Sequence, residues 1–232
     1  MQLVADSDAQ TVLLVAPAGY GKTTLARQWL NGRSSAWWYS AGEASFDVAE
    51  LALGLARALE PVCDGALDGI RQHLQLTPNP ATDVEGIAAR FRDLLEGSRP
   101  ACGVIDDLHH LGQNSAASRP VAEVRESLAR KILIASRTRP LWVTPRTSLY
   151  GATAVIDHSE LAMTDIEIAQ LLEASGKPVD AQAIERARGW PLLVSLSAGG
   201  SPTVNVGDFG HLDNDLAKFL STEILGSIDP RS

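Results

Sequence analysis

The sequence predicts a three-layer α/β fold, in which helices cover both faces of a parallel β-sheet, followed by a small helical subdomain. Two observations support this fold class. Segments typical of strands alternate with segments typical of helices over most of the first 160 residues. The strand segments are almost continuously apolar, which is typical of parallel strands covered on both faces. After Ile156 the pattern changes to short helical segments in succession.

The bulk composition narrows the class of protein. The chain has 232 residues and 45% hydrophobic residues, which suits one large domain or one domain with a small companion. Its net charge of −8 means that the chain as a whole lacks the excess of basic residues typical of a nucleic-acid-binding protein. Cys63 and Cys102 are too few for a disulfide framework and fit a reducing, cytoplasmic setting. No apolar run reaches the ~18 residues of a membrane span, and the N-terminus lacks the basic region of a signal peptide.

The first predicted elements are a strand over Thr11–Ala16 and a helix over Gly21–Leu30. Between them lies a glycine-rich turn, which runs from Ala16 into Gly21-Lys22-Thr23. This order is that of a phosphate-binding loop, in which backbone N–H groups and a helix N-terminus face phosphate oxygens. Ala16 replaces the first glycine of the usual pattern, a mild departure. The alternative, a turn that binds nothing, is disfavoured by the strand before it and the helix after it.

The loop predicts a nucleotide site for ATP or ADP with Mg²⁺. Lys22 is expected to reach the β- and γ-phosphates, and Thr23 to place its hydroxyl on the metal ion. The residues expected to bind the nucleotide here are Pro17, Ala18, Gly19, Tyr20, Gly21, Lys22, Thr23 and Thr24.

Four further elements are predicted before the next motif. The first three are a buried strand over Ala36–Ser40, a helix from Val48 to Leu59, and a short helix and loop between Asp64 and Pro80. The fourth is a helix that begins at a capping box over Thr82–Glu85 and ends at Gly97 and Pro100.

A predicted strand over Ala101–Ile105 ends in two adjacent acids. In a phosphate-loop protein the first, Asp106, would lie beside Mg²⁺, and the second, Asp107, would act as general base on an attacking water. The alternative is a simple Asp-Asp turn, which is disfavoured because the pair follows the loop by about 80 residues within one α/β domain. His109 either hydrogen-bonds near the phosphate or is a structural loop histidine, the role that we favour for His110.

A helix over Ala122–Ala129 and a strand over Lys131–Ala135 lead to Ser136-Arg137. The Arg137 guanidinium would contact the γ-phosphate and sense its presence. The alternative is a basic residue that only solvates a strand end, and Arg139 fits that description. Arg146 is a further possible contact on the following loop.

Helices dominate the remainder of the chain. A second capping box, Thr164–Glu167, opens one helix and Asp180 another. Gly189-Trp190-Pro191 ends a helix and starts the next, with proline in its first turn. Trp37, Trp38 and Trp190 are expected to pack in cores or between domains.

In this order, the motifs from the phosphate loop to Gly-Trp-Pro resemble those of the signal-transduction ATPases called STAND. Within that class the chain is similar to the nucleotide-binding region of maltose-activator and large LuxR-type transcriptional regulators. The resemblance implies a P-loop NTPase sheet of the additional-strand class followed by a helical domain. It also implies that Pro191 lies against the bound nucleotide and that Arg137 is the sensor arginine. The stretch Ala41–Phe46 departs from these relatives, which tend to be more acidic there.

The expected organisation is a nucleotide-binding domain over 1–160, a helical subdomain over 161–200, a linker over 201–212 and the start of a truncated winged-helix region over 213–232. The chain would be a slow ATPase that serves as a regulatory switch, with Lys22, Asp107 and Arg137 in catalysis. ADP would hold it closed, and ATP, favoured by an unknown inducer, would open it for self-association. DNA would bind only through regions that this chain lacks, and no membrane partner is expected.

Two other classes of function remain open. A small-molecule P-loop kinase would need a lid with arginines and an acceptor pocket, and no clear lid is found. A nucleotide-free interaction module would retain the loop as a relic, which the intact Gly21-Lys22-Thr23 and the acid pair argue against.

Overall fold

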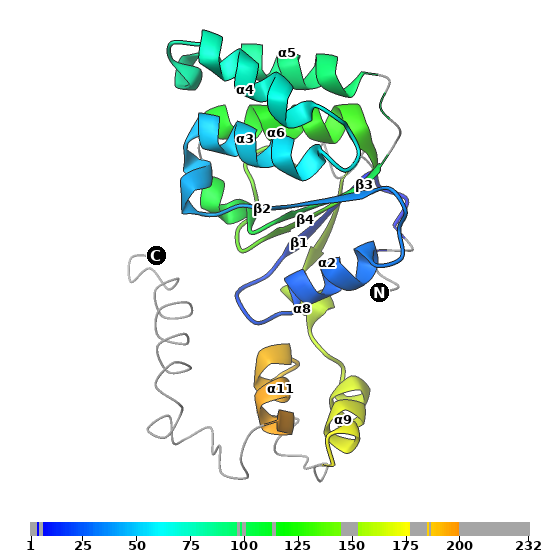
Figure 1. Cartoon of the computed structure of the whole chain (residues 1–232). Coiled ribbons are helices and arrows are strands. Elements are labelled where there is room, and N and C mark those ends of the chain that lie inside the picture. Colours follow the sequence, from blue (N-terminus) through cyan, green and yellow to red (C-terminus); the bar gives the residue numbers. More distant parts are fainter. Residues whose placement is uncertain are drawn as a thin grey trace, which may run out of the picture. The chain divides into compact units, whose positions relative to one another are not determined.

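The computed structural model describes residues 4, 7–96, 98, 101–112, 115–144, 153–176, 185 and 187–199 (Figure 1). The chain divides into two compact units. One comprises 1–15 and 23–156, and the other comprises 16–22 and 157–232. Arg146, the linker, the last helix, Gly97 and Pro100 lie outside the described residues. Of the predicted helix from Asp180, only Glu185 and Ala187 are described, and both are helical.

A five-stranded sheet forms the centre of the first unit, in the order β2-β3-β4-β1-β5. The strands are β1 (Thr11–Val15), β2 (Ala36–Ser40), β3 (Ala101–Asp106), β4 (Ala129–Ser136) and β5 (Thr153–Asp157). β1 pairs with β4, β4 with β3 and β3 with β2, all in parallel. The predicted parallel sheet is therefore confirmed, and β4, inserted between β1 and β3, is the additional strand that the resemblance implies.

The register brings the carboxyl ends of these strands to one edge of the sheet. Val15 pairs with Ser136, and Ile105 pairs with Ile134 one residue before β3 ends. The loops that follow β1, β3 and β4 therefore all leave from the same edge, which is where open α/β sheets carry their ligands.

Helices cover both faces of this sheet, as predicted (Figure 1). α2 lies on one face, and α3 and α6 lie on the other, with α4 and α5 packed outside them. Their apolar residues, together with those of the strands, form one core, which includes Leu51, Leu55, Phe91, Ile105 and Ile132. The bounds of these helices are Lys22–Leu30 for α2, Val48–Leu59 for α3, Ala66–Leu76 for α4, Val84–Leu95 for α5 and Ser115–Leu128 for α6.

The second unit contains three described helices and a small apolar cluster of its own. The helices are α8 (His158–Leu161), α9 (Asp165–Ala174) and α11 (Pro191–Gly199). The predicted capping box at Thr164 is confirmed, because Thr164 Oγ1 accepts from Glu167 N–H while the Glu167 carboxylate accepts from Thr164 N–H. None of the described helices in either unit is long and apolar enough to cross a bilayer.

The capping box at Thr82 is wrong. Thr82 ends a 3₁₀ turn (η2, Pro80–Thr82), so that Asp83 becomes the N-cap residue of α5. The Asp83 side chain caps nothing, because its Oδ2 lies 2.8 Å from His73 Nε2 and accepts from Thr77 Oγ1 at 3.2 Å. A tertiary link to the end of α4 thus replaces the local cap.

Two element bounds also need correction. α6 starts at Ser115, well before the predicted Ala122, and accommodates Pro120 in its interior. Ala129 belongs to β4 instead of the helix. The strand β5 was not predicted.

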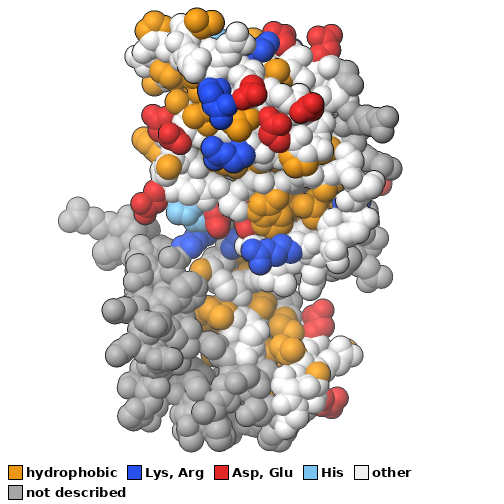
Figure 2. All heavy atoms as spheres, viewed as in Figure 1, with side chains coloured by type: hydrophobic (Ala, Val, Ile, Leu, Met, Phe, Trp, Pro, Cys, Tyr) orange, Lys and Arg blue, Asp and Glu red, His pale blue; other side chains and the backbone are white. Residues whose placement is uncertain are grey.

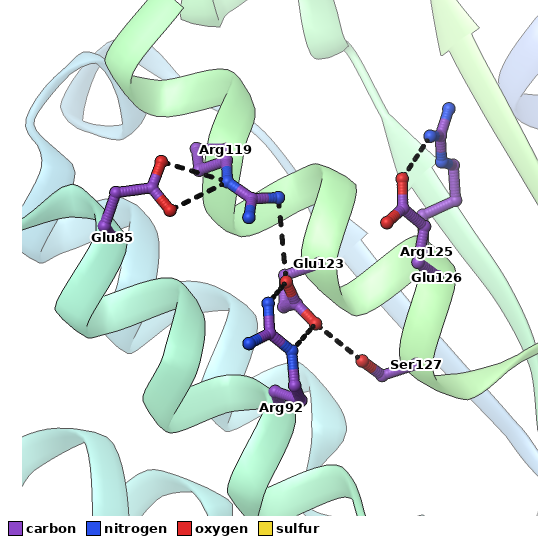
Figure 3. A network of polar contacts seen from close by, with 7 residues as sticks. All are labelled: Glu85, Arg92, Arg119, Glu123, Arg125, Glu126 and Ser127. Atoms are coloured by element: carbon purple, nitrogen blue, oxygen red, sulfur yellow. Dashed lines mark hydrogen bonds and ion pairs between the residues drawn. The ribbon is translucent and has the colours of Figure 1, made fainter.

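A buried carboxylate, Glu123, joins α5 to α6 (Figure 3). Arg92 donates to both of its oxygens, at 2.9 and 2.7 Å, and Ser127 Oγ donates at 3.0 Å. Arg119 Nη1 lies 3.6 Å from Glu123 and also pairs with Glu85. The hydrogen bonds from Arg92 hold the pKa of Glu123 below its usual value. On the face of the molecule in Figure 2, acidic and basic side chains are interspersed over these helices.

Replacing Glu123 with glutamine should lower the free energy of unfolding by about 1–3 kcal/mol at pH 7, since Arg92 loses its charged partner. The lowered pKa means that the carboxylate stabilises the fold above its unfolded pKa. That contribution disappears as the pH falls through the folded pKa, so the two proteins converge in acid. Urea denaturation at pH 7 and at successively lower pH measures this.

Glu126→Gln is the matched control on the same helix. The Glu126 side chain is 60% exposed and pairs only with its neighbour Arg125 among the described residues, whereas Glu123 is 5% exposed. The control should cost less than about 1 kcal/mol. An equal loss in the two variants would refute the role of Glu123.

Candidate functional site

The glycine-rich loop spans residues 16–21, between the end of β1 and the start of α2. Gly19 and Gly21 have φ values of +80° and +72°, a left-handed conformation that glycine adopts without a steric penalty. Within the described part of the chain, the N–H groups of Ala18, Gly19 and Gly21 donate no hydrogen bond. The loop therefore presents backbone donors at the start of a nine-residue helix, an arrangement suited to an anion.

Lys22 is the first residue of α2 and is only 7% exposed. Its ammonium group donates to the carbonyl oxygens of Ala16 at 2.7 Å and Pro17 at 2.9 Å. These bonds fold the side chain back over the loop, so that a positive charge lies close to its backbone donors. Thr23 and Thr24 follow in the first turn of α2, half-buried and exposed respectively. A cation, backbone amides and a helix N-terminus together fit a polyphosphate.

The acid pair lies at the carboxyl end of β3. Asp106 is 3% exposed, and its Oδ1 accepts the Asp107 N–H at 3.0 Å. Asp107 adopts a left-handed φ of +54°, which aspartate tolerates better than most residues. This turn separates the two carboxylates, because the Asp107 side chain is 41% exposed while Asp106 stays buried. A buried oxygen donor suits a metal ion, and an accessible carboxylate suits a proton acceptor for water.

His109 and His110 follow in the 3₁₀ turn η3 (Leu108–Leu111). His109 Nδ1 lies 3.9 Å from Asp107 Oδ1, which is longer than a hydrogen bond. The two imidazole rings lie 4.5 Å apart between centroids. His109 is therefore the histidine beside the acid pair, and His110 packs against it.

Arg137 leaves β4 immediately after the buried Ser136. The Ser136 hydroxyl donates to Thr138 O at 2.6 Å and accepts from Thr138 N at 3.3 Å, which fixes the turn that carries Arg137. Arg137 is half-buried, whereas Arg139 is exposed, as expected of a residue that solvates a strand end. The register places Asp106, Asp107 and Arg137 at one edge of the sheet, on two neighbouring strands.

The loop and the Gly-Trp-Pro motif belong to the second unit. Trp190 Nε1 donates to Ala18 O at 3.2 Å, and Leu192 N donates to Gly19 O at 3.0 Å. Pro191 lies between these two contacts and is the first residue of α11, as predicted. The Tyr20 ring meets the His158 ring edge to face, with centroids 6.1 Å apart. Pro191 is therefore held next to the loop.

The sequence assigned Trp190 to packing and missed its polar contact with the loop. The one signal that could have found it is the position of Trp190 beside Pro191, the residue already expected near the nucleotide. Trp190 and Leu192 also approach Gly19 closely. The sequence carries no comparable signal for this contact, because glycine occurs in many kinds of turn.

Comparisons with known proteins agree with this architecture. The model of the AAA domain family matches residues 5–140. The HTH-type transcriptional regulator MalT of Klebsiella pneumoniae is 25% identical over 252 aligned positions, which span 100% of this chain and 27% of that protein. The chain thus spans about a quarter of this curated relative's length.

A solved structure supports the fold in particular. It is a signal transduction ATPase with numerous domains (STAND) protein with a tetratricopeptide repeat sensor, from Pyrococcus horikoshii. Its TM-score is 0.60 at 18% identity, over 95% of this chain and 33% of that one. Because the family model matches more than half of this chain, the chain belongs to the AAA domain family. Within that family it resembles the STAND-class P-loop ATPases.

Proposed function

We propose that this chain is the ATP- and ADP-binding switch of a signal-responsive transcriptional regulator and hydrolyses ATP slowly. The observation that carries the proposal is the phosphate loop. Three loop amides that donate no hydrogen bond within the described residues, the folded-back Lys22 ammonium and the N-terminus of α2 lie within one short stretch of chain. Similarity to MalT, whose name describes a transcriptional regulator, supplies the regulatory context.

Each residue of the site has a proposed task. The loop from Pro17 to Gly21 and the first turn of α2 surround the phosphates. The N–H groups that follow Pro17 donate to phosphate oxygens, and Lys22 provides the positive charge. Thr23 and Asp106 hold Mg²⁺, which when bound neutralises phosphate charge.

Three residues complete the site. Asp107 orients a water molecule and accepts its proton. Arg137 contacts the γ-phosphate, so that its contact depends on which nucleotide is present. Pro191 lies against the nucleotide from the side of the helical subdomain.

The proposed switch depends on a difference in nucleotide affinity between a closed and an open arrangement of the chain. If the closed arrangement binds ADP more tightly than the open one, ADP stabilises the closed form, and exchange for ATP releases it for self-association. The inducer that favours exchange is unknown, and we propose no direct contact of these residues with DNA. We place the protein in the cytoplasm, where the free thiols of Cys63 and Cys102 stay reduced.

Phosphate release from ATP tests the proposal against a small-molecule kinase. ATP consumption by the chain with Mg²⁺ is measured alone and again with glycerol or glucose as acceptor. We expect slow release of inorganic phosphate that neither acceptor changes. Turnover that depends on the acceptor would support the kinase, and no binding of ATP or ADP would support an interaction module.

A further inference from the structure

The phosphate loop has two faces, and the helical segment holds only one of them. The carbonyl oxygens of Ala18 and Gly19 accept hydrogen bonds from Trp190 Nε1 and Leu192 N. The N–H groups of the same two residues donate no hydrogen bond within the described chain. The segment Trp190–Leu192 thus engages the carbonyl side of the loop and leaves its donors available.

The contact is close-packed as well as hydrogen-bonded. A Cβ atom built on Gly19 would lie 2.6 Å from Trp190 Nε1 and 2.7 Å from Leu192 Cβ. Real Cβ atoms do not approach other atoms so closely, so a side chain at Gly19 would displace the segment. Gly21 has a similar φ, yet a Cβ there would meet nothing within 4 Å.

The segment is itself held firmly by the second unit. Gly189 O accepts from Met163 N at 2.8 Å, and Trp190 N donates to Ala187 O at 2.7 Å. Val194 of α11 packs with Ile168 and Leu172 of α9 in the apolar cluster of this unit. Trp190 and Leu192 are therefore presented to the loop from a supported scaffold.

We propose that Trp190 and Leu192 are positioning residues that clasp the carbonyl side of the phosphate loop and hold its N–H groups ready for phosphate. This proposal rests on the proposed nucleotide site and deepens it. Docking of the helical segment and binding of nucleotide become coupled through the loop backbone, without requiring contact between helix and nucleotide. The coupling is reciprocal, so loss of the clasp weakens nucleotide binding by the same factor as nucleotide strengthens the clasp.

Trp190→Phe tests the hydrogen bond, because phenylalanine keeps the ring but lacks the indole N–H. Without nucleotide, hydrogen exchange of the Leu192 amide should accelerate. The Kd for ADP should rise about three- to tenfold, as expected for loss of one net hydrogen bond. Trp29→Phe is the matched control, because Trp29 Nε1 is buried and makes no hydrogen bond within the described chain. It should change neither quantity.

A pair of glycine variants tests the packing. Gly19→Ala carries backbone strain and the clash with Trp190 and Leu192, whereas Gly21→Ala carries only the strain. In the absence of nucleotide, exchange of the Leu192 amide should accelerate in Gly19→Ala alone. Unchanged Leu192 exchange in both Trp190→Phe and Gly19→Ala would overturn the clasp, and so would faster exchange with an unaltered Kd for ADP.

Different experimental results would refute the clasp and the proposed function. If the wild-type chain binds neither ADP nor ATP, the nucleotide site is refuted and the positioning role falls with it. Protection of the Leu192 amide, measured without nucleotide, still reports whether the loop and the segment are joined.

Discussion

Lys22→Ala is expected to raise the Kd for ADP by at least about 100-fold, which corresponds to about 2.7 kcal/mol. The substitution removes a charge-assisted contact to phosphate and also the two hydrogen bonds that tie the side chain to Ala16 O and Pro17 O. Both the charge and the shape of the loop are therefore altered. Isothermal titration with ADP measures the change.

Lys131→Ala is a matched control for this experiment. Lys131 Nζ also donates to two backbone carbonyls, those of Val4 and Ser7, so its loss removes comparable hydrogen bonds. It lies near the start of β4, at the opposite end of that strand from Ser136. The control should lower stability and leave ADP affinity within about twofold, since no charge near the loop changes. Unchanged ADP affinity in Lys22→Ala would show that the loop is not the nucleotide site.

Asp107→Asn is expected to slow ATP hydrolysis by about 10²- to 10⁴-fold, the usual range for removal of a general base. Asparagine adopts the left-handed backbone of this position as readily as aspartate, so the turn after β3 should persist. ADP affinity should change little, because the Asp107 carboxylate is proposed to contact water and not phosphate. Release of inorganic phosphate and titration with ADP give the two values.

Asp106→Asn distinguishes the proposed role of Asp106 from that of Asp107. Asp106 is buried and proposed to face the metal ion, so its loss should weaken Mg²⁺-dependent ATP binding before it affects any later step. Hydrolysis at the wild-type rate in Asp107→Asn would contradict the assignment of the general base. A collapse of ADP binding in that variant would contradict it as well, since it would make Asp107 a binding residue.

The features predicted from the sequence are those that depend on local pattern. The apolar strands from Thr11 and Ala101 are continuous enough to require burial on both faces, so a parallel sheet followed directly. The Thr164 capping box is likewise local, because all of its atoms lie within four residues.

The features that were missed depend on partners distant in sequence. Asp83 is a good capping residue, yet His73 and Thr77 engage its carboxylate. Trp190 has the composition of a packing residue, and only folding brings its indole N–H to Ala18 O, 172 residues away.

The central claim is that this chain holds a nucleotide in its phosphate loop, and the nucleotide that co-purifies with it tests the claim most directly. The purified chain is denatured with acid, and the released nucleotides are separated by chromatography and quantified against protein. The account predicts stoichiometric ADP, as expected of a switch that rests in its closed form. An empty protein that then binds neither ADP nor ATP in the presence of Mg²⁺ would contradict it.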